Sequence, residues 1–255
     1  MGYYPKHNFL KNKNILVTGA GAGIGREAAL TYAFYGATVL LLGRTENKLN
    51  EVKRKIAKMG GNEAHVLVFD LSCNNPESYQ FLAEDLFNSH SYLDGLLNNA
   101  ALLGEIAPMS KQTPSRWLEV IAVNVNGTFM LTQALLPLLL NSNKGSSIIF
   151  TTSSVGRKGR GHWGAYSVSK FATEGMMQVF AEEYCAHTLR VNCVNPGRTQ
   201  TNMRASACPT EKSSQLKNPA DIMSIYLYLM GDDSQSKTGI SFDAQSFDCD
   251  LSKFI

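Results

Sequence analysis

Short apolar runs alternate with longer segments of helical composition along a chain of 255 residues. The run at 38–42 has no polar alternation, which is typical of a parallel strand buried on both faces. We expect strands at 14–18, 38–42, 64–69, 93–97, 146–152, 189–194 and 240–242. The expected helices lie at 26–35, 45–59, 76–89, 113–140, 165–187 and 219–230. This alternation favours an α/β fold.

The length, together with the lack of a low-complexity linker, fits one domain over residues 1–255 with an ample core. The net charge is only +3 and the basic residues are scattered, so we expect no nucleic-acid partner. The first 14 residues are polar, and the most apolar stretch, 129–140, is interrupted by Thr132, Gln133 and Pro137. We therefore expect a cytoplasmic protein that does not span a membrane.

The cysteines are odd in number and far apart, without a CxxC pair. They are Cys73, Cys185, Cys193, Cys208 and Cys249. This spacing predicts free thiols in a reducing compartment and no metal site.

A glycine-rich turn, Gly19-Ala20-Gly21-Ala22-Gly23-Ile24-Gly25, joins the first expected strand to the first expected helix. This is the context of a phosphate-binding loop, because glycines let the backbone approach a pyrophosphate and free N–H groups at the helix start meet its charge. The alternative is an ordinary glycine-rich surface turn.

The end of the second strand indicates which dinucleotide is preferred. Folds that prefer NAD place a carboxylate about 20 residues after the glycine motif, whereas an arginine there accommodates the 2′-phosphate of NADP. Here Gly43 stands 18 residues past Gly25, and Arg44 follows it. The sequence predicts NADP(H); the alternative is that Arg44 merely opens the next helix.

Tyr166 and Lys170 lie four residues apart in an expected helix, on the same face and one turn from each other. A neighbouring ammonium favours the phenolate, so Lys170 is expected to lower the pKa of Tyr166 towards the range useful for proton transfer. The spacing is also common on ordinary amphipathic helices, so other motifs decide its meaning.

Such motifs accompany the pair: the TGxxxGxG loop, Asn98-Asn99-Ala100, Asn124, and Ser153-Ser154 before Tyr166. Together they resemble the short-chain dehydrogenase/reductase family, and the similarity runs from about Lys13 to Ala244. Within the family, the segments 122–137, 203–207 and 242–245 are similar to the bacterial YciK-type oxidoreductases, a subgroup with no agreed substrate.

The resemblance implies a Rossmann-type, doubly wound three-layer sandwich with a seven-stranded parallel sheet, assembled as a homodimer or homotetramer. It implies that a hydride passes between the nicotinamide of NADP(H) and the carbonyl or secondary alcohol carbon of a small substrate. Tyr166 would give or take the proton on oxygen, Ser154 would hold that oxygen, and Lys170 would tune Tyr166 and bind the nicotinamide ribose. Asn124 would maintain a water relay to the lysine.

The resemblance also implies a set of cofactor contacts, in which an aspartate meets the adenine and a Pro-Gly turn fixes the carboxamide. They are Thr18, Gly19, Gly23, Ile24, Gly25, Arg44, Asp70, Leu71, Asn98, Ala100, Tyr166, Lys170, Pro196, Gly197, Thr199 and Thr201. Two positions depart from the family pattern: Ala101 stands in place of a glycine, and Asp243-Ala244-Gln245 replaces the usual DGG. A cap for the following loop is an equal alternative for Asp70.

Three surface features complete the prediction. Residues 202–217 are polar and without a clear period, so we expect a mobile lid over the substrate at about 199–217. The loop 156–164 carries Arg157, Lys158 and Arg160, which either favour an acidic group on the substrate or form a solvated turn.

The leucines of 131–140 exceed one buried stripe and, with Met176 and Met177, are expected to pack on a partner subunit. The competing function is a non-catalytic NADP(H)-binding redox sensor or assembly protein. The intact Tyr, Lys, Ser and Asn set argues against it, since a protein that only binds needs no proton relay.

Overall fold

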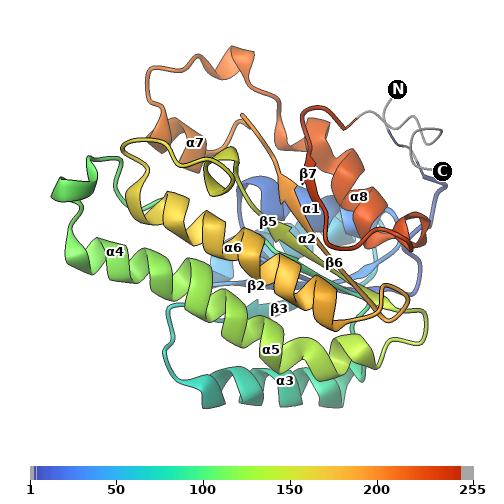
Figure 1. Cartoon of the computed structure of the whole chain (residues 1–255). Coiled ribbons are helices and arrows are strands. Elements are labelled where there is room, and N and C mark those ends of the chain that lie inside the picture. Colours follow the sequence, from blue (N-terminus) through green and yellow to red (C-terminus); the bar gives the residue numbers. More distant parts are fainter. Residues whose placement is uncertain (1–2, 4, 248–255) are drawn as a thin grey trace.

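The computed structural model describes residues 3 and 5–247 (Figure 1); Cys249 and the two ends of the expected 1–255 domain lie outside this part. Seven strands form one parallel sheet in the order β3-β2-β1-β4-β5-β6-β7. They are β1 Asn14–Thr18, β2 Thr38–Gly43, β3 His65–Val68, β4 Gly95–Asn98, β5 Ser146–Thr151, β6 Leu189–Asn195 and β7 Ser241–Asp243. The expected seven-stranded, doubly wound sheet is confirmed.

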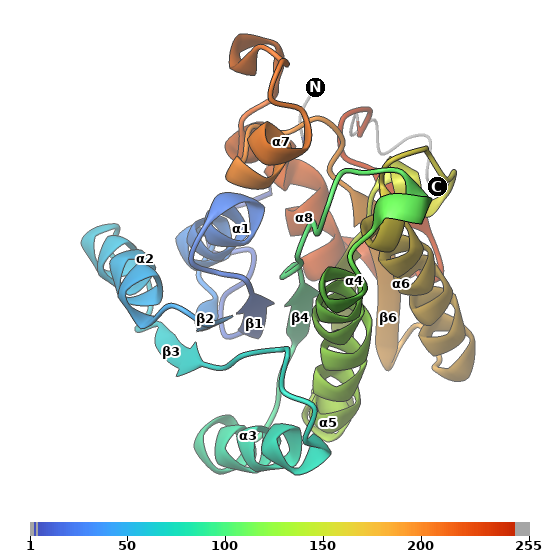
Figure 2. The same cartoon turned by 90° about the vertical axis from the view of Figure 1, so that its left-hand side faces the viewer.

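Helices cover both faces of the sheet, and Figure 2 shows α1 and α8 on one side of the strands and α3 and α5 on the other. The α-helices are α1 Gly23–Phe34, α2 Glu46–Lys58, α3 Pro76–His90, α4 Pro114–Ile121, α5 Thr128–Leu140, α6 Gly164–Glu183, α7 Asn202–Ala207 and α8 Met223–Met230. Short 3₁₀ turns lie at η1 Met109–Lys111, η3 Ser154–Gly156, η4 Ser213–Gln215, η5 Pro219–Ile222 and η6 Asp232–Ser234.

The strand β2 lacks polar alternation because it contributes side chains to two cores. In β2, Val39 and Leu41 join the core beneath α1, α2 and α8, whereas Leu40 and Leu42 join the core beneath α3, α5 and α6. Successive side chains of a strand point to opposite faces, so a sheet covered on both sides needs apolar residues at every position.

The sheet order reverses at β1, which pairs with β2 on one side and with β4 on the other. The connections after these two strands leave in opposite directions, and a crevice forms at their carboxyl ends, where ligands bind in such folds. The topology therefore places the expected site at this edge.

The expected helix 113–140 is continuous in the structure, and Gly127 does not break it. A π-helical turn, η2 Ala122–Gly127, joins α4 to α5. The glycine is required because a Cβ at Gly127 would run into the backbone carbonyl of Leu71. π-turns of this kind often occur at functional sites, and this one carries the predicted Asn124.

The leucines of 131–140 belong mostly to the core, contrary to the expected partner interface. Leu131, Leu135, Leu138 and Leu139 are buried against the sheet, Leu136 is half-buried, and Leu140 alone of these six leucines is exposed. The run Pro114–Leu140 is long and apolar enough to cross a membrane by composition, yet 56% of its most apolar window is buried within this fold. It is the core helix of this domain.

Candidate active site

A cavity of about 740 Å³ opens at the carboxyl edge of the sheet. Thirteen of the predicted cofactor contacts line it: Gly19, Gly23, Ile24, Arg44, Asp70, Leu71, Ala100, Tyr166, Lys170, Pro196, Gly197, Thr199 and Thr201. Loops after β1, β2, β3, β4, β5 and β6 thus contribute to one site, although the residues are distant in sequence.

The glycine turn has the geometry of a phosphate cradle. Gly19 and Gly23 have positive φ angles of +66° and +54°, which favour glycine. A Cβ on Gly19 would lie 3.1 Å from the Cα of Ala100. Ala22, the N-cap residue of α1, lines the cavity and offers no side-chain cap, so the helix start is open to an anion.

Positive charge without a partner lies beside this cradle. Arg44 lines the cavity and makes no hydrogen bond or ion pair with any residue that the structure describes, and Lys48 lines the cavity one turn into α2. Gly43 supplies no carboxylate that would repel a phosphate. These residues fit the 2′-phosphate of NADP(H) and offer nothing for an unphosphorylated ribose.

Asp70 caps its own loop and also lies at the cavity, where its contact with the adenine stays a prediction. Its Oδ1 accepts a hydrogen bond from the backbone N–H of Ser72 at 2.9 Å, and the residue lines the cavity. The local bond fixes the loop after β3 and leaves Oδ2 for a ligand.

Three predicted contacts support the cavity from behind and do not line it: Thr18, Gly25 and Asn98. The Thr18 hydroxyl accepts from the backbone N–H groups of Asn99 and Ala100 at 2.9 and 3.0 Å. A Cβ on Gly25 would lie 2.5 Å from the Asn99 side chain. These residues shape the loop after β4, and their direct contact with a cofactor stays a prediction.

Asn98, the cofactor contact that the resemblance implied, does not line the cavity, whereas its neighbour Asn99 does. Asn98 is buried and its Nδ2 donates to the Thr132 hydroxyl at 3.0 Å, so it fixes α5 to β4. Asn99 lines the cavity and its Nδ2 donates to the Thr18 carbonyl at 3.2 Å. At the end of a strand, adjacent side chains point to opposite faces of the sheet. The motif alone does not say which of the two faces the cavity.

Tyr166 and Lys170 meet in the cavity as the spacing predicts. Both are buried, and the Lys170 Nζ lies 5.6 Å from the centre of the Tyr166 ring. The ammonium donates to the backbone carbonyl of Thr151 at 2.7 Å, which ties α6 to the end of β5. The Trp163 ring lies 5.8 Å from the Tyr166 ring and also lines the cavity.

The serine beside the tyrosine is Ser153, and the assignment of Ser154 needs correction. The Ser153 side chain lines the cavity and forms a hydrogen bond with the Tyr166 phenol, whereas Ser154 is exposed and does not line the cavity. Ser153 is extended and caps η3, and the chain turns immediately after it. This turn directs the two neighbouring serines to different sides.

The expected lowering of the Tyr166 pKa by Lys170 is not found. Burial raises the pKa of Tyr166 to about 12, and the hydrogen bond with Ser153 opposes this rise only in part. Burial also lowers the pKa of Lys170 to about 8. At neutral pH the phenol therefore holds its proton, and the lysine is the group of the pair that titrates nearest to physiological pH.

Asn124 connects two walls of the site. Its Oδ1 accepts from the backbone N–H of Leu102 at 2.7 Å, and its Nδ2 donates to the Leu102 carbonyl at 2.9 Å. The same Nδ2 donates to the Ser169 hydroxyl at 3.0 Å, and Ser169 lies next to Lys170 on α6. The side chain thus fixes the loop after β4 against α6; its part in a water relay stays a prediction.

The segment expected as an irregular lid contains a helix, α7, whose residues Met203, Arg204 and Ala207 line the cavity. At the base of the segment, the Gln200 N–H donates to the Lys217 carbonyl at 2.8 Å. Within the segment, Glu211 accepts from the Arg204 side chain at 2.6 and 2.9 Å. These bonds, with a further one from Arg198, lower the pKa of Glu211 to about 2.

Within the described residues, no group of three or more His, Cys, Asp or Glu side chains could hold a metal ion. The cysteines among them, Cys73, Cys185, Cys193 and Cys208, are free thiols.

Comparison with known proteins relates this site to one family. Residues 13–212 match the family model for short chain dehydrogenase. The chain is 59% identical to the uncharacterized oxidoreductase YciK of Escherichia coli over 245 residues, which are 96% of each protein.

Solved structures agree with this relationship. A short chain dehydrogenase from Shigella flexneri complexed with NADP is 58% identical, with a TM-score of 0.92 over 94% of this chain and 100% of that one. A short chain dehydrogenase from Escherichia coli complexed with NADPH is 59% identical, with the same TM-score of 0.92 and the same coverage of 94% and 100%.

Proposed function

The chain belongs to the short-chain dehydrogenase family, and from that premise we propose that it is an NADP(H)-dependent oxidoreductase acting on a carbonyl or secondary alcohol. The observation that carries the proposal is the meeting of Ser153, Tyr166 and Lys170 in the cavity that also holds the glycine cradle and Arg44. A protein that only binds the nucleotide would not need this buried set of proton-carrying groups. The relatives solved with NADP and NADPH support the choice of cofactor.

Different residues of the cavity would bind different parts of the cofactor. The open start of α1 would meet the pyrophosphate, Arg44 the 2′-phosphate and Asp70 the adenine. The turn of Pro196 and Gly197 would meet the nicotinamide end. When bound, the cofactor supplies or accepts the hydride of the reaction.

The protein's own groups then handle the oxygen. In reduction, Tyr166 donates its phenolic proton to the substrate oxygen, which becomes the hydroxyl of the product; in oxidation it takes that proton back. Ser153 holds the oxygen by a hydrogen bond, and the positive charge of Lys170 favours the phenolate that reduction leaves behind. The raised pKa of Tyr166 keeps the donor protonated at neutral pH.

The substrate that fits best is a neutral carbonyl compound with an apolar body. Leu102, Leu103, Trp163 and Met203 line the cavity together with Tyr166. Arg204 also lines it, but its charge is matched by Glu211. A carboxylate or phosphate on the substrate would have to displace that partner, which costs more than binding an uncharged ketone.

The segment 199–217 would act as the lid over this substrate, since it carries Met203 and Arg204 and is joined at its base. We also propose a cytoplasmic homodimer or homotetramer. Exposed apolar side chains on α4, α5 and α6 support such an assembly, including Leu118, Phe129 and Phe171.

The test combines a binding assay with turnover. Wild-type protein is titrated with NADPH by fluorescence and then assayed with NADPH on a panel of neutral ketones, aldehydes and keto acids. Tyr166→Phe removes only the hydroxyl, so it should bind NADPH normally and lose turnover by about 10²-fold or more. Wild-type turnover in this variant would refute the role of Tyr166. A wild type that binds NADPH but reduces nothing in the panel would favour a redox sensor.

A further inference from the structure

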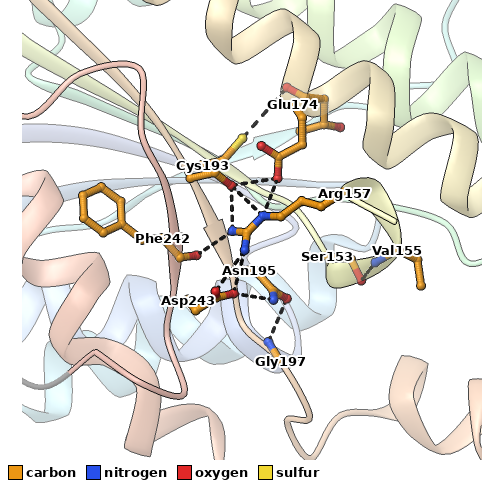
Figure 3. Close-up of polar contacts among 11 residues, drawn as sticks. Ser153, Val155, Arg157, Glu174, Cys193, Asn195, Gly197, Phe242 and Asp243 are labelled. Carbon is orange, nitrogen blue, oxygen red and sulfur yellow. Dashed lines mark hydrogen bonds and ion pairs between the residues drawn. The ribbon is translucent and has the colours of Figure 1, made fainter. Parts of the chain in front are cut away.

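The basic loop after β5 has a use that differs from both expectations. Arg157 follows η3 and does not line the cavity; it binds side chains of α6 and β7 (Figure 3). Its Nη1 donates to both carboxylate oxygens of Asp243 at 2.9 Å each. Its Nε and Nη2 donate to the Ser241 hydroxyl at 3.1 and 2.7 Å, and Nε lies 3.4 Å from the Glu174 carboxylate. The guanidinium is thus held by two acidic groups.

Asp243 extends this contact to the turn after β6. Its Oδ1 also accepts from the Asn195 Nδ2 at 2.6 Å, and the Asn195 Oδ1 accepts from the backbone N–H of Gly197 at 3.1 Å. Two residues further on, the Gln245 Nε2 donates to the Pro196 carbonyl at 2.8 Å. The residues that replace the family's usual DGG therefore hold the Pro196-Gly197 turn.

On its other side, the network reaches the serine turn, defined as residues 153–157. The Val155 carbonyl in this turn accepts from the Ser167 hydroxyl of α6 at 2.6 Å. Gly156 packs on the backbone of Lys170 so closely that a Cβ would lie 2.7 Å from its carbonyl oxygen. Because the serine turn packs directly on α6, even a small shift of this turn would move its serine relative to the reacting groups on α6.

We propose that Arg157 is a positioning residue which, through Asp243, holds the serine turn and the Pro196-Gly197 turn in one fixed arrangement. The two turns line the same cavity from the ends of β5 and β6, and the chain between them runs through the whole of α6 and β6. The guanidinium is held at all three nitrogens, by Asp243 at Nη1 and by Ser241 at Nε and Nη2, and together these bonds fix both its distance and its orientation, which a single hydrogen bond does not. The hydrogen-exchange test is independent of the proposed oxidoreductase function, and the NADPH readout rests only on its cofactor.

The test is hydrogen exchange on free protein for Arg157→Gln, Asp243→Asn and the double variant. Arg160→Gln is the matched control, because Arg160 lies in the same loop, is exposed, and its side chain has no hydrogen bond within the described residues. We expect faster exchange in both 153–158 and 195–200 for each single variant, with no further gain in the double variant. The control should leave both segments unchanged.

Faster exchange in only one of the two segments after Arg157→Gln, or an increase spread over the whole protein, would overturn the proposal. The second readout is NADPH affinity by fluorescence, which should weaken by about three- to tenfold in both single variants and not in the control. Unchanged affinity in both single variants would equally count against it. Neither measurement needs turnover, so a wild type without carbonyl reductase activity would contradict the proposed function and leave this test decisive.

Discussion

The Lys170 ammonium lies 5.6 Å from the centre of the Tyr166 ring, and it donates its short hydrogen bond to Thr151 and not to the phenol. Burial acts on the two groups in opposite directions: it raises the pKa of Tyr166 to about 12 and lowers that of Lys170 to about 8. The lysine is therefore the member of the pair whose charge changes just above neutral pH, and the first prediction concerns it.

We expect NADPH affinity to fall by about tenfold as pH rises from about 7 to about 9, because Lys170 loses the charge that would bind the nicotinamide ribose. Fluorescence titration at several pH values measures this. Lys170→Met has no charge to lose and should bind weakly with a flat profile. Equal pH dependence in wild type and variant would refute the assignment.

The same shift predicts the stability of the free protein. Between about pH 8 and about pH 10 the unfolded chain keeps the Lys170 proton while the folded protein has released it, so Lys170 makes stability rise with pH in this window. The free energy of unfolding, measured by urea titration at several pH values, should therefore rise between about pH 8 and about pH 10 in wild type. In Lys170→Met this rise should be missing.

The neighbouring serines form a matched pair of variants. Ser153→Ala removes the hydroxyl that bonds Tyr166 and should lower kcat by about 10²-fold while NADPH affinity stays near the wild-type value. Ser154→Ala changes an exposed side chain and should leave kcat within about twofold. Steady-state kinetics on the best carbonyl from the panel decides between them; the reverse order of effects would restore the assignment to Ser154.

Cofactor preference is expected to depend on Arg44. NADPH should bind more tightly than NADH. Arg44→Ala should reduce the difference between their binding free energies by about 1–3 kcal/mol, the scale of a charge-assisted hydrogen bond. Arg54→Ala is the control, since Arg54 is exposed on α2 and does not line the cavity. Titrations that show equal affinity of wild type for the two cofactors would contradict the prediction.

The pairing of Arg204 with Glu211 predicts substrate charge. Wild type should prefer a neutral ketone to a keto acid of similar size, and Glu211→Gln should raise relative kcat/KM for the acid by about tenfold, because Arg204 then lacks its ionic partner. Lys212→Gln changes a neighbouring charge outside the cavity and should leave the ratio unchanged. A wild-type preference for the acid would refute the proposed substrate class.

Assembly is expected to depend on the exposed apolar side chains of α4, α5 and α6. Phe171 is 46% exposed on α6, and Phe171→Glu should lower the mass measured by light scattering at micromolar concentration. Phe81→Glu is the control, because Phe81 is 65% exposed on α3. A wild type that is monomeric would show that these faces have another use.

The sequence was sufficient to predict the succession of the seven strands along the chain and the Tyr166–Lys170 pair, because apolar periodicity and helical spacing are local properties. It did not separate Ser153 from Ser154, or Asn98 from Asn99. In each pair the residue types are the same, and the direction of a turn after the strand decides which side chain enters the cavity. That direction depends on packing against α6 and β1.

Two other misses have non-local causes. The pKa of Tyr166 was expected to fall because a cation lies nearby, but the degree of burial outweighs that neighbour and is not visible in spacing. The partners of Arg157 lie 17 residues away at Glu174 and 86 residues away at Asp243. No local pattern marks such a network, although the unusual residues at the end of β7 were a signal that this edge differs from the family.

The position of β7 has a consequence for synthesis of the protein. The glycine turn, Arg44 and Asp70 follow β1, β2 and β3, which are neighbours in the sheet and leave the ribosome well before β7. Among the described strands β7 is translated after the other six, pairs with β6 alone, and carries Asp243. The nascent chain can therefore form its nucleotide cradle before β7 is made, but the serine turn and the Pro196-Gly197 turn stay uncoupled until β7 has been translated.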